Sequence, residues 1–143
     1  MKFLTVTKDG GEESTVWAYW LVEIKSLFSV AVLVFENGSR DAYHSHAFNC
    51  VSWLLCGRLM EEFVDGNIKW YWPSLAFPII TRRDTFHKVT STGRSVVLTF
   101  RGPWASKWKE HVDGREITLT HGRKVVEDEA RAAASQSPPG PSA

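Results

Sequence analysis

Residues 44–56 read HSHAFNCVSWLLC, and this stretch decides the fold that the sequence predicts. Its aromatic, β-branched and aliphatic side chains are typical of a β-strand. Gly57 follows as a tight turn, and residues 58–64 (RLMEEFV) return as the predicted hairpin partner. Because side chains alternate between the two faces of a strand, His44 and His46 are predicted to project from the same face.

The segments on either side of this hairpin have the same character. No part of the chain before residue 104 shows a convincing 3.6-residue periodicity, and short apolar runs alternate with Gly, Asp and Asn turns. About eight strands at such close spacing predict an all-β sandwich or barrel, with Thr92-Gly93 as the hairpin turn between the last two. Residues 104–120 are predicted to form a short helix and then a final strand over 116–120. The other predicted strands cover residues 16–25, 29–36, 68–72, 77–81, 86–91 and 95–101.

Length and composition indicate one small domain. The chain has 143 residues, of which 43% are hydrophobic, and this is enough for a single core. We expect a barrel domain over residues 1–127. Residues 128–143 form a Ser-, Pro- and Ala-rich tail that is predicted to be disordered, because it has too little apolar surface to order itself.

Charge and targeting signals narrow the function classes. The net charge of +1 gives no electrostatic reason to expect nucleic acid or an anionic membrane as a partner. The N-terminal residues lack the pattern of a signal peptide, and the longest apolar run, residues 30–35, is far shorter than the roughly 20 residues that cross a bilayer. Cys50 and Cys56 lie about 20 Å apart on one predicted strand, so no disulfide is expected between them. A cytoplasmic protein with two free thiols is the simplest expectation.

Three of the five histidines suit a metal site. His44 and His46 offer two imidazoles side by side, which is half of a site for Zn, Fe, Ni or Cu. His87 lies on a later predicted strand, at a distance along the chain that lets a barrel wind back to the pair. The three side chains are therefore candidate metal ligands, although an H-x-H pair alone also fits histidines that bond only to protein groups.

The spacing around the pair resembles the first motif of the cupin superfamily. Gly38, the H-x-H pair and Gly57 fall at the positions of that motif, and Cys50 stands where the motif has Glu. His87 matches the histidine of the second motif, whose Pro and Gly are not kept. The resemblance covers roughly residues 31–103. It implies a double-stranded β-helix, the cupin jelly-roll barrel, in which these three histidines bind a metal ion.

Two groups within the superfamily are more similar than the rest. Three histidines without the Glu resemble the Fe(II) site of the thiol dioxygenases, and cysteine dioxygenase also carries Cys at the position of Cys50. Residues 43–49 and His87 look like a group of uncharacterised bacterial and phage cupins with an H-x-H-P-W-D-F motif, in which Glu61 matches a Glu after the glycine turn. The resemblances imply a divalent metal ion as cofactor, with Fe(II) first and Zn, Mn or Ni as alternatives.

Further residues are candidates for roles beside the metal. Glu61 and Glu62 have opposite parity, so only one can face the barrel, and Glu61 could be a general base or the partner of a histidine N–H. Arg101 lies near the end of an inward strand and could orient an anionic substrate. Cys50 is either a fourth ligand or a small buried side chain.

These features together predict a metal-dependent enzyme, namely a mononuclear, non-haem, dioxygenase-like oxidoreductase with a small-molecule substrate. Three neutral ligands around a 2+ ion leave net charge and open positions, which favours an anionic substrate. The alternatives are a non-catalytic ligand-binding module and a Lewis-acid isomerase or lyase. Exposed edge strands make a homodimer a further expectation, in keeping with the resemblance to cupins.

Overall fold

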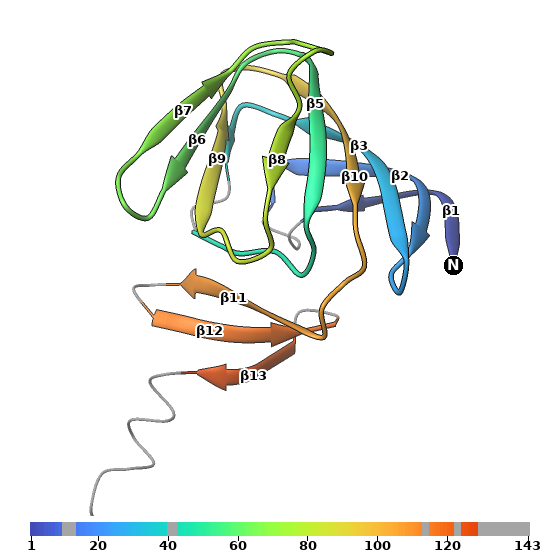
Figure 1. Cartoon of the computed structure of the whole chain (residues 1–143), viewed down its shortest axis with the longest axis vertical. Coiled ribbons are helices and arrows are strands. Elements are labelled where there is room, and N and C mark those ends of the chain that lie inside the picture. Colours follow the sequence, from blue (N-terminus) through green and yellow to red (C-terminus); the bar gives the residue numbers. More distant parts are fainter. Residues whose placement is uncertain (10–13, 40–42, 113–114, 122–123, 129–143) are drawn as a thin grey trace, which may run out of the picture.

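The computed structural model describes residues 1–9, 14–39, 43–112, 115–121 and 124–128 (Figure 1). These residues form strands, turns and loops, and no helix occurs among them. The strands are β1 (Lys2–Lys8), β2 (Val16–Ile24), β3 (Phe28–Phe35), β4 (Gly38–Ser39), β5 (Cys50–Cys56), β6 (Leu59–Phe63), β7 (Ile68–Tyr71), β8 (Ile79–Thr81), β9 (His87–Ser91), β10 (Ser95–Arg101), β11 (Lys107–Val112), β12 (Arg115–Thr120) and β13 (Lys124–Asp128).

The described strands form three sheets. The larger barrel sheet has the order β1-β2-β3-β10-β5-β8, the smaller barrel sheet has the order β4-β9-β6-β7, and the C-terminal sheet has the order β11-β12-β13. In Figure 1 the two barrel sheets curve around a shared interior, and the C-terminal sheet lies below one end of the barrel. The all-β prediction is confirmed.

The hydrophobic core fills the space between the two barrel sheets. Buried and exposed side chains alternate along β2, so that Val16, Ala18 and Trp20 face inward. Leu59 of β6 and Val89 of β9 pack against this cluster from the opposite sheet. Because inward and outward side chains alternate along the strands, the inward ones enclose the barrel interior in which the histidines lie.

The two predicted hairpins are wrong in their pairing, although their turns are correctly located. Strand β5 pairs with β10 and β8, whereas β6 pairs with β7 and β9, so Gly57 carries the chain from one sheet to the other. Gly57 has a φ of +89°, and a Cβ there would lie 2.2 Å from Ser95 Oγ and 2.6 Å from the Arg94 carbonyl oxygen. Only glycine fits this crossing. Gly93 likewise separates β9 and β10, which belong to different sheets.

The predicted strand over residues 44–56 is also shorter in the structure, where β5 begins at Cys50. The chain bends at Ala47 and Phe48, and Asn49 then anchors it just before β5. The Asn49 carbonyl oxygen accepts a hydrogen bond from Gly102 N at 2.8 Å, and its side-chain oxygen accepts one from Arg83 N at 2.9 Å. These bonds separate the histidine pair from the strand that follows it.

The predicted helix within residues 104–120 is wrong. This region forms the antiparallel pair β11 and β12, in which Trp108 lies opposite Leu119 and Glu110 opposite Ile117. Leu119 is only 2% exposed. Exposure alternates along β11, in which Lys107 and Lys109 are exposed whereas Trp108 and Glu110 are more buried, and this period of two is typical of a strand.

Three remaining expectations concern the chain as a whole. Among the described residues, no helix is long and apolar enough to span a bilayer. Cys50 and Cys56 are both free, as predicted. The described chain ends at Asp128 in β13, so the predicted tail lies almost entirely outside the described residues and the predicted boundary at residue 127 stays a prediction.

Candidate metal centre

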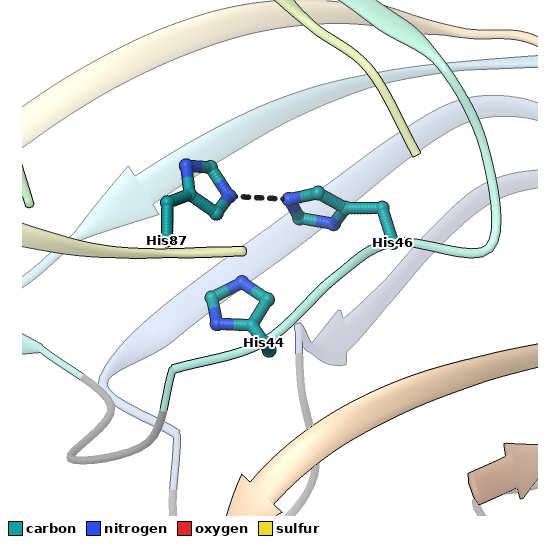
Figure 2. A group of neighbouring side chains, drawn as sticks. All are labelled: His44, His46 and His87. Carbon is teal, nitrogen blue, oxygen red and sulfur yellow. Dashed lines mark hydrogen bonds between the residues drawn. The ribbon is translucent and has the colours of Figure 1, made fainter. Parts of the chain in front are cut away.

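Three imidazole rings converge inside the barrel, and Figure 2 shows them turned toward one another. One potential ligand nitrogen from each of His44, His46 and His87 lies within 4.8 Å of the other two. The Nε2 atoms of His46 and His87 are 2.7 Å apart. The structure therefore brings together the three histidines that the sequence predicts as ligands.

Backbone pairing sets His44 opposite His87. The His44 N–H donates to the His87 carbonyl oxygen at 3.0 Å, and the His87 N–H donates back to the His44 carbonyl oxygen at 3.1 Å. Two residues on, the His46 N–H donates to the Arg83 carbonyl oxygen at 3.1 Å. The histidine pair thus runs alongside the chain that enters β9, and local alternation directs both rings to one side.

The other edge of the same segment is fastened to β11. The Ser45 N–H donates to the Lys109 carbonyl oxygen at 3.0 Å, and Ser45 Oγ accepts a hydrogen bond from the Lys109 N–H at 3.1 Å. The His111 N–H donates to the Tyr43 carbonyl oxygen at 2.9 Å. Ser45 is 6% exposed, so water competes little for these bonds. The positions of the two histidines therefore depend on the C-terminal sheet.

A buried carboxylate orients His87. Glu61 is 4% exposed, its Oε1 bonds to His87 Nδ1, and its Oε2 accepts a hydrogen bond from the Tyr71 hydroxyl. A carboxylate at Nδ1 keeps the proton of a neutral imidazole there, which leaves the lone pair of Nε2 directed at the centre. The neighbouring Glu62 points the other way and forms an ion pair with Lys88 at 3.2 Å. Glu61 is therefore the inward member of the pair.

The electrostatics of the centre favour a neutral His46 imidazole and an ionised Glu61 carboxylate. Burial, and after it the neighbouring His44 and His87, hold the pKa of His46 well below its usual value. Burial by itself raises the pKa of Glu61, but the hydrogen bonds from His87 and Tyr71 outweigh it, so that this pKa is lowered. Burial and Glu61 both raise the pKa of Tyr71, which keeps the phenol protonated. Neutral imidazole is the form that binds metal ions.

This donor set fits a divalent transition metal ion. Imidazole nitrogen suits Fe, Zn, Ni and Cu, and a carboxylate behind a ligating histidine is its usual outer partner. Nitrogens bound to one ion at about 2.1 Å lie about 3.0 Å apart in octahedral and about 3.4 Å apart in tetrahedral geometry. The 2.7 Å between the two Nε2 atoms is somewhat shorter, so a small separation of these two rings would admit an ion. Neither Cys50 nor Glu61 belongs to the group of converging ligand atoms among the described residues. Cys50 instead lines the adjoining cavity.

The imidazoles open into a cavity of about 440 Å³. That volume is within the range of pockets that hold small molecules. Much of its wall is apolar and comes from both barrel sheets and the segment before β5. The apolar side chains include Val16, Trp20, Leu33, Phe35, Phe48, Leu59, Ile79, Val89 and Val97.

Arg101 lines this cavity, but its charge is already paired. Its two terminal nitrogens donate to the Asp9 carboxylate at 3.1 and 2.8 Å, and the side chain is 4% exposed. The guanidinium lies over the rings of Trp20 and Phe48, with Cζ 4.9 and 4.6 Å from their centroids. Arg101 Nε and Trp104 Nε1 are buried with no hydrogen-bond partner among the described residues. Asp9 therefore already occupies the two-pronged side of the guanidinium, and Nε is the guanidinium nitrogen without a partner among the described residues.

Sequence reasoning missed three contributors to the site, namely Asp9, Ser45 and Tyr71. For Tyr71 a signal existed, because pairing β6 with β7 across the Asp65-Gly66 turn places it opposite Leu59 and on the face of Glu61. No local pattern pointed to Asp9 or Ser45. Their partners lie 92 and 64 positions away in the sequence.

Several solved structures of cupins are similar to this chain over most of the barrel. An RmlC-like cupin from Shewanella frigidimarina is 16% identical with a TM-score of 0.53, covering 67% of this chain and 81% of its own. A sugar phosphate isomerase of the cupin superfamily from Silicibacter pomeroyi is 11% identical with a TM-score of 0.55, covering 76% and 73%. The iron(II) form of HppE is 13% identical with a TM-score of 0.57, covering 68% and 55%.

These likenesses establish the fold. The chain has the double-stranded β-helix fold of the cupins, which confirms the fold that the resemblance implied, and a three-histidine group lies inside it. No family model matches the sequence, and no curated protein matches it significantly. The chemistry of the site must therefore be argued from its own residues.

Proposed function

We propose that this chain is a mononuclear metal enzyme, a dioxygenase-like oxidoreductase that acts on a small anionic molecule. His44, His46 and His87 would hold a divalent ion, with Fe(II) first and Zn, Mn or Ni as alternatives. The observation that carries the proposal is the convergence of three imidazoles, one of them braced by a buried carboxylate, at the wall of a cavity of small-molecule size.

The chain's own residues would prepare the centre for reaction. When bound, the ion would supply Lewis acidity and, in the case of Fe(II), electrons for chemistry with dioxygen. Glu61 holds the proton of His87 at Nδ1, and Tyr71 holds the second oxygen of Glu61, so the ring is oriented before a substrate arrives. Glu61 thus acts as a positioning residue, and the apolar cavity wall limits the entry of water.

The unpaired donors of the cavity indicate where a substrate would be anchored. Within the described part of the chain, Arg101 Nε and Trp104 Nε1 lack acceptors, and both side chains contact the ring of Phe48. A buried donor without a partner costs about 1–3 kcal/mol, and an acceptor oxygen of the substrate would offset this cost. Phe48 also contacts His46, with ring centroids 5.3 Å apart. A substrate that reaches from the ion to Arg101 would therefore lie along the Phe48 ring.

A charged substrate is favoured at the ion itself. Three neutral imidazoles leave the 2+ charge of the ion uncompensated by its ligands, so an anionic group gains most by approaching it. At Arg101, the other end of the path along the Phe48 ring, the Asp9 carboxylate balances the charge of the guanidinium. We therefore expect the anionic group of the substrate at the histidines and a carbonyl or carboxylate oxygen near Arg101.

Metal binding is the first test of this proposal. The purified full chain, stripped of metal and reconstituted with Fe(II) in the absence of oxygen, should bind about one equivalent of iron. The variant His87→Ala should bind less than about 0.2 equivalents. The exposed His121 provides a matched control, because His121→Ala should keep full binding. Less than about 0.2 equivalents of any transition metal in the unmodified chain would contradict the proposal.

Oxygen uptake tests the reaction class. The iron-loaded chain is mixed with a panel of small carboxylic and thiol-carboxylic acids, and oxygen consumption is measured together with product formation. Uptake in step with product, and absent in His87→Ala, supports an oxidoreductase. Turnover without oxygen uptake would instead identify a Lewis-acid isomerase or lyase. Ligand binding that survives in His87→Ala, with no turnover, would identify a binding module.

A further inference from the structure

The cavity beside the histidines is polar at one end. Strand register arranges the inward side chains of the larger barrel sheet in rows that run across the strands. The first row includes Glu23, Arg101 and Thr81, and the second row includes Thr5, Thr99 and Ser52. All six of these side chains line the cavity. Two neighbouring rows of polar groups therefore form one end of its wall.

Farther along the same strands, the wall becomes apolar. The third row includes Leu33 and Val97, and the fourth includes Val16 and Phe35. Leu59 of the smaller sheet packs into the same cluster and also lines the cavity. None of these five side chains has a polar atom, so they offer a ligand only hydrocarbon contacts. The cavity thus has a polar end and an apolar end.

The histidines lie at the polar end. Phe48, two residues after His46, contacts both the His46 ring and the Arg101 guanidinium of the first row. On the smaller sheet, His87 is the first residue of β9, whereas Leu59 lies opposite Ser91 at the other end of that strand. The candidate metal centre and the polar rows therefore share one end of the cavity, and the apolar rows extend away from it.

Three buried polar atoms of this cavity have no hydrogen-bond partner within the described part of the chain. They are Thr5 Oγ1, Arg101 Nε and Trp104 Nε1, and all three residues line the cavity. The two nitrogens can only donate a hydrogen bond, whereas the hydroxyl can donate or accept one. Because buried donors are normally paired, these atoms favour a ligand that brings oxygen acceptors to the polar end.

We infer that the substrate of the proposed enzyme is a hydroxy or oxo acid that carries a hydrocarbon side chain. Its carboxylate lies at the ion, its second oxygen function accepts a hydrogen bond from Arg101 or Trp104, and its hydrocarbon part fills the apolar end. The position of the carboxylate rests on the proposed function, whereas the two ends are properties of the cavity itself.

The volume of the cavity limits the length of the side chain. At about 30 Å³ for each water-sized group, 440 Å³ holds roughly 15 non-hydrogen atoms. The carboxylate, the carbon with the oxygen function and a spacer account for about six of these atoms, which leaves a side chain of up to about eight carbons. Each methylene buried in the apolar end should strengthen binding about fourfold.

Binding of a graded series of acids tests the inference. Isothermal titration calorimetry is carried out on the full chain, both metal-free and loaded with Zn(II). The probes are the 3-hydroxy acids from 3-hydroxybutanoate to 3-hydroxydodecanoate and the unsubstituted acids of the same lengths. Affinity should rise about fourfold with each methylene and level off within the series. Each hydroxy acid should bind about fivefold more tightly than the unsubstituted acid of its length.

Two substitutions test the two ends separately. Val97→Phe narrows the apolar end, so long acids should lose at least about tenfold in affinity while the shortest acids bind as before. Leu98→Phe, at the adjacent residue whose side chain faces outward, is the matched control, and Leu33→Phe is a second variant if Val97→Phe does not fold. Trp104→Phe removes the indole N–H, so it should reduce the advantage of the hydroxy acids but keep the dependence on chain length.

Three results would overturn the inference. They are an affinity that is independent of chain length, unsubstituted acids that bind as tightly as the hydroxy acids, and an equal response of folded Val97→Phe and Leu98→Phe. Circular dichroism establishes that each variant is folded. A chain that binds no ion but keeps the dependence on chain length contradicts the proposed function and supports the two-ended cavity. A chain that binds the ion without that dependence overturns this inference alone.

Discussion

The two halves of the candidate metal centre are held in different ways. His87 lies on a regular strand, β9, and hydrogen bonds within the smaller sheet link it to Glu61 and Tyr71. His44 and His46 belong to no named strand and take backbone partners from the chain near β9 on one side and from β11 on the other. One ligand is thus oriented through its side chain, and the other two through their backbone. The two halves should therefore respond differently to substitution.

Removal of His87, the ligand that lies on strand β9, should have the largest effect on metal binding. His87→Ala deletes one ligand and also removes one of the two hydrogen-bond partners of the buried Glu61 carboxylate. We therefore expect a loss of metal affinity of more than about 100-fold and a loss of about 1–3 kcal/mol in the free energy of unfolding. His46→Ala, in the segment before β5 that carries His44 and His46, should lose metal binding to a similar extent with little change in stability. Metal-competition titration and urea unfolding of the metal-free proteins measure the two effects. Equal stability of the two variants would argue against the difference between the halves.

Loss of the charge behind His87 should have the next largest effect. Glu61→Gln keeps the shape of the side chain but removes the carboxylate that orients the ring, which should lower metal affinity about 10- to 100-fold. Glu62→Gln is the matched control, because the adjacent carboxylate faces outward and should leave metal affinity unchanged. If the two substitutions weaken metal binding equally, then Glu61 does not act through His87.

Weakening the contact between the segment of His44 and His46 and strand β11 should have a smaller effect on metal binding. Ser45→Ala removes the buried hydroxyl that bonds to both the N–H and the carbonyl oxygen of Lys109, so the free energy of unfolding should fall by about 1–2 kcal/mol. Metal affinity should fall less than about tenfold, because both imidazoles remain. Hydrogen exchange should show faster opening of β11 in this variant, while β9 keeps its protection. Unchanged exchange in β11 would contradict the dependence of the histidine pair on the C-terminal sheet.

The outermost member of the His87 network should have the smallest effect. Tyr71→Phe removes only the hydroxyl that bonds to Glu61. This hydroxyl reaches His87 only through two successive hydrogen bonds, so its loss should weaken metal binding by roughly twofold to fivefold. Combined with Glu61→Gln, it should add little, because both substitutions act through the same contact. Fully additive effects in this double-mutant cycle would show that Tyr71 acts by another route.

The sequence was a good guide to the strands and a poor guide to their partners. Alternation located the barrel strands of the core, and the glycine turns fell at Gly57 and Gly93. These turns resemble those of hairpins, yet each carries the chain from one sheet to the other. Turn chemistry is local, whereas the choice of sheet is settled by packing across the whole barrel, which no short window contains.

The same limit applies to the site. The imidazoles and the parity of Glu61 could be predicted, because they follow from residue type and strand alternation. The pairing of Arg101 with Asp9 and of Ser45 with Lys109 could not, because each joins segments that are far apart in the sequence. The prediction of a helix within residues 104–120 was wrong for a related reason, since pairing with a neighbouring strand decides the structure of so short a segment.

The central claim is that His44, His46 and His87 bind one metal ion together. X-ray absorption spectroscopy of the Fe(II)-loaded chain measures the ligands of the ion directly. We expect nitrogen or oxygen scatterers, with the outer-shell pattern of about three imidazoles and no sulfur. A spectrum that shows at most one imidazole, or a sulfur ligand from Cys50 in place of a histidine, would contradict the claim.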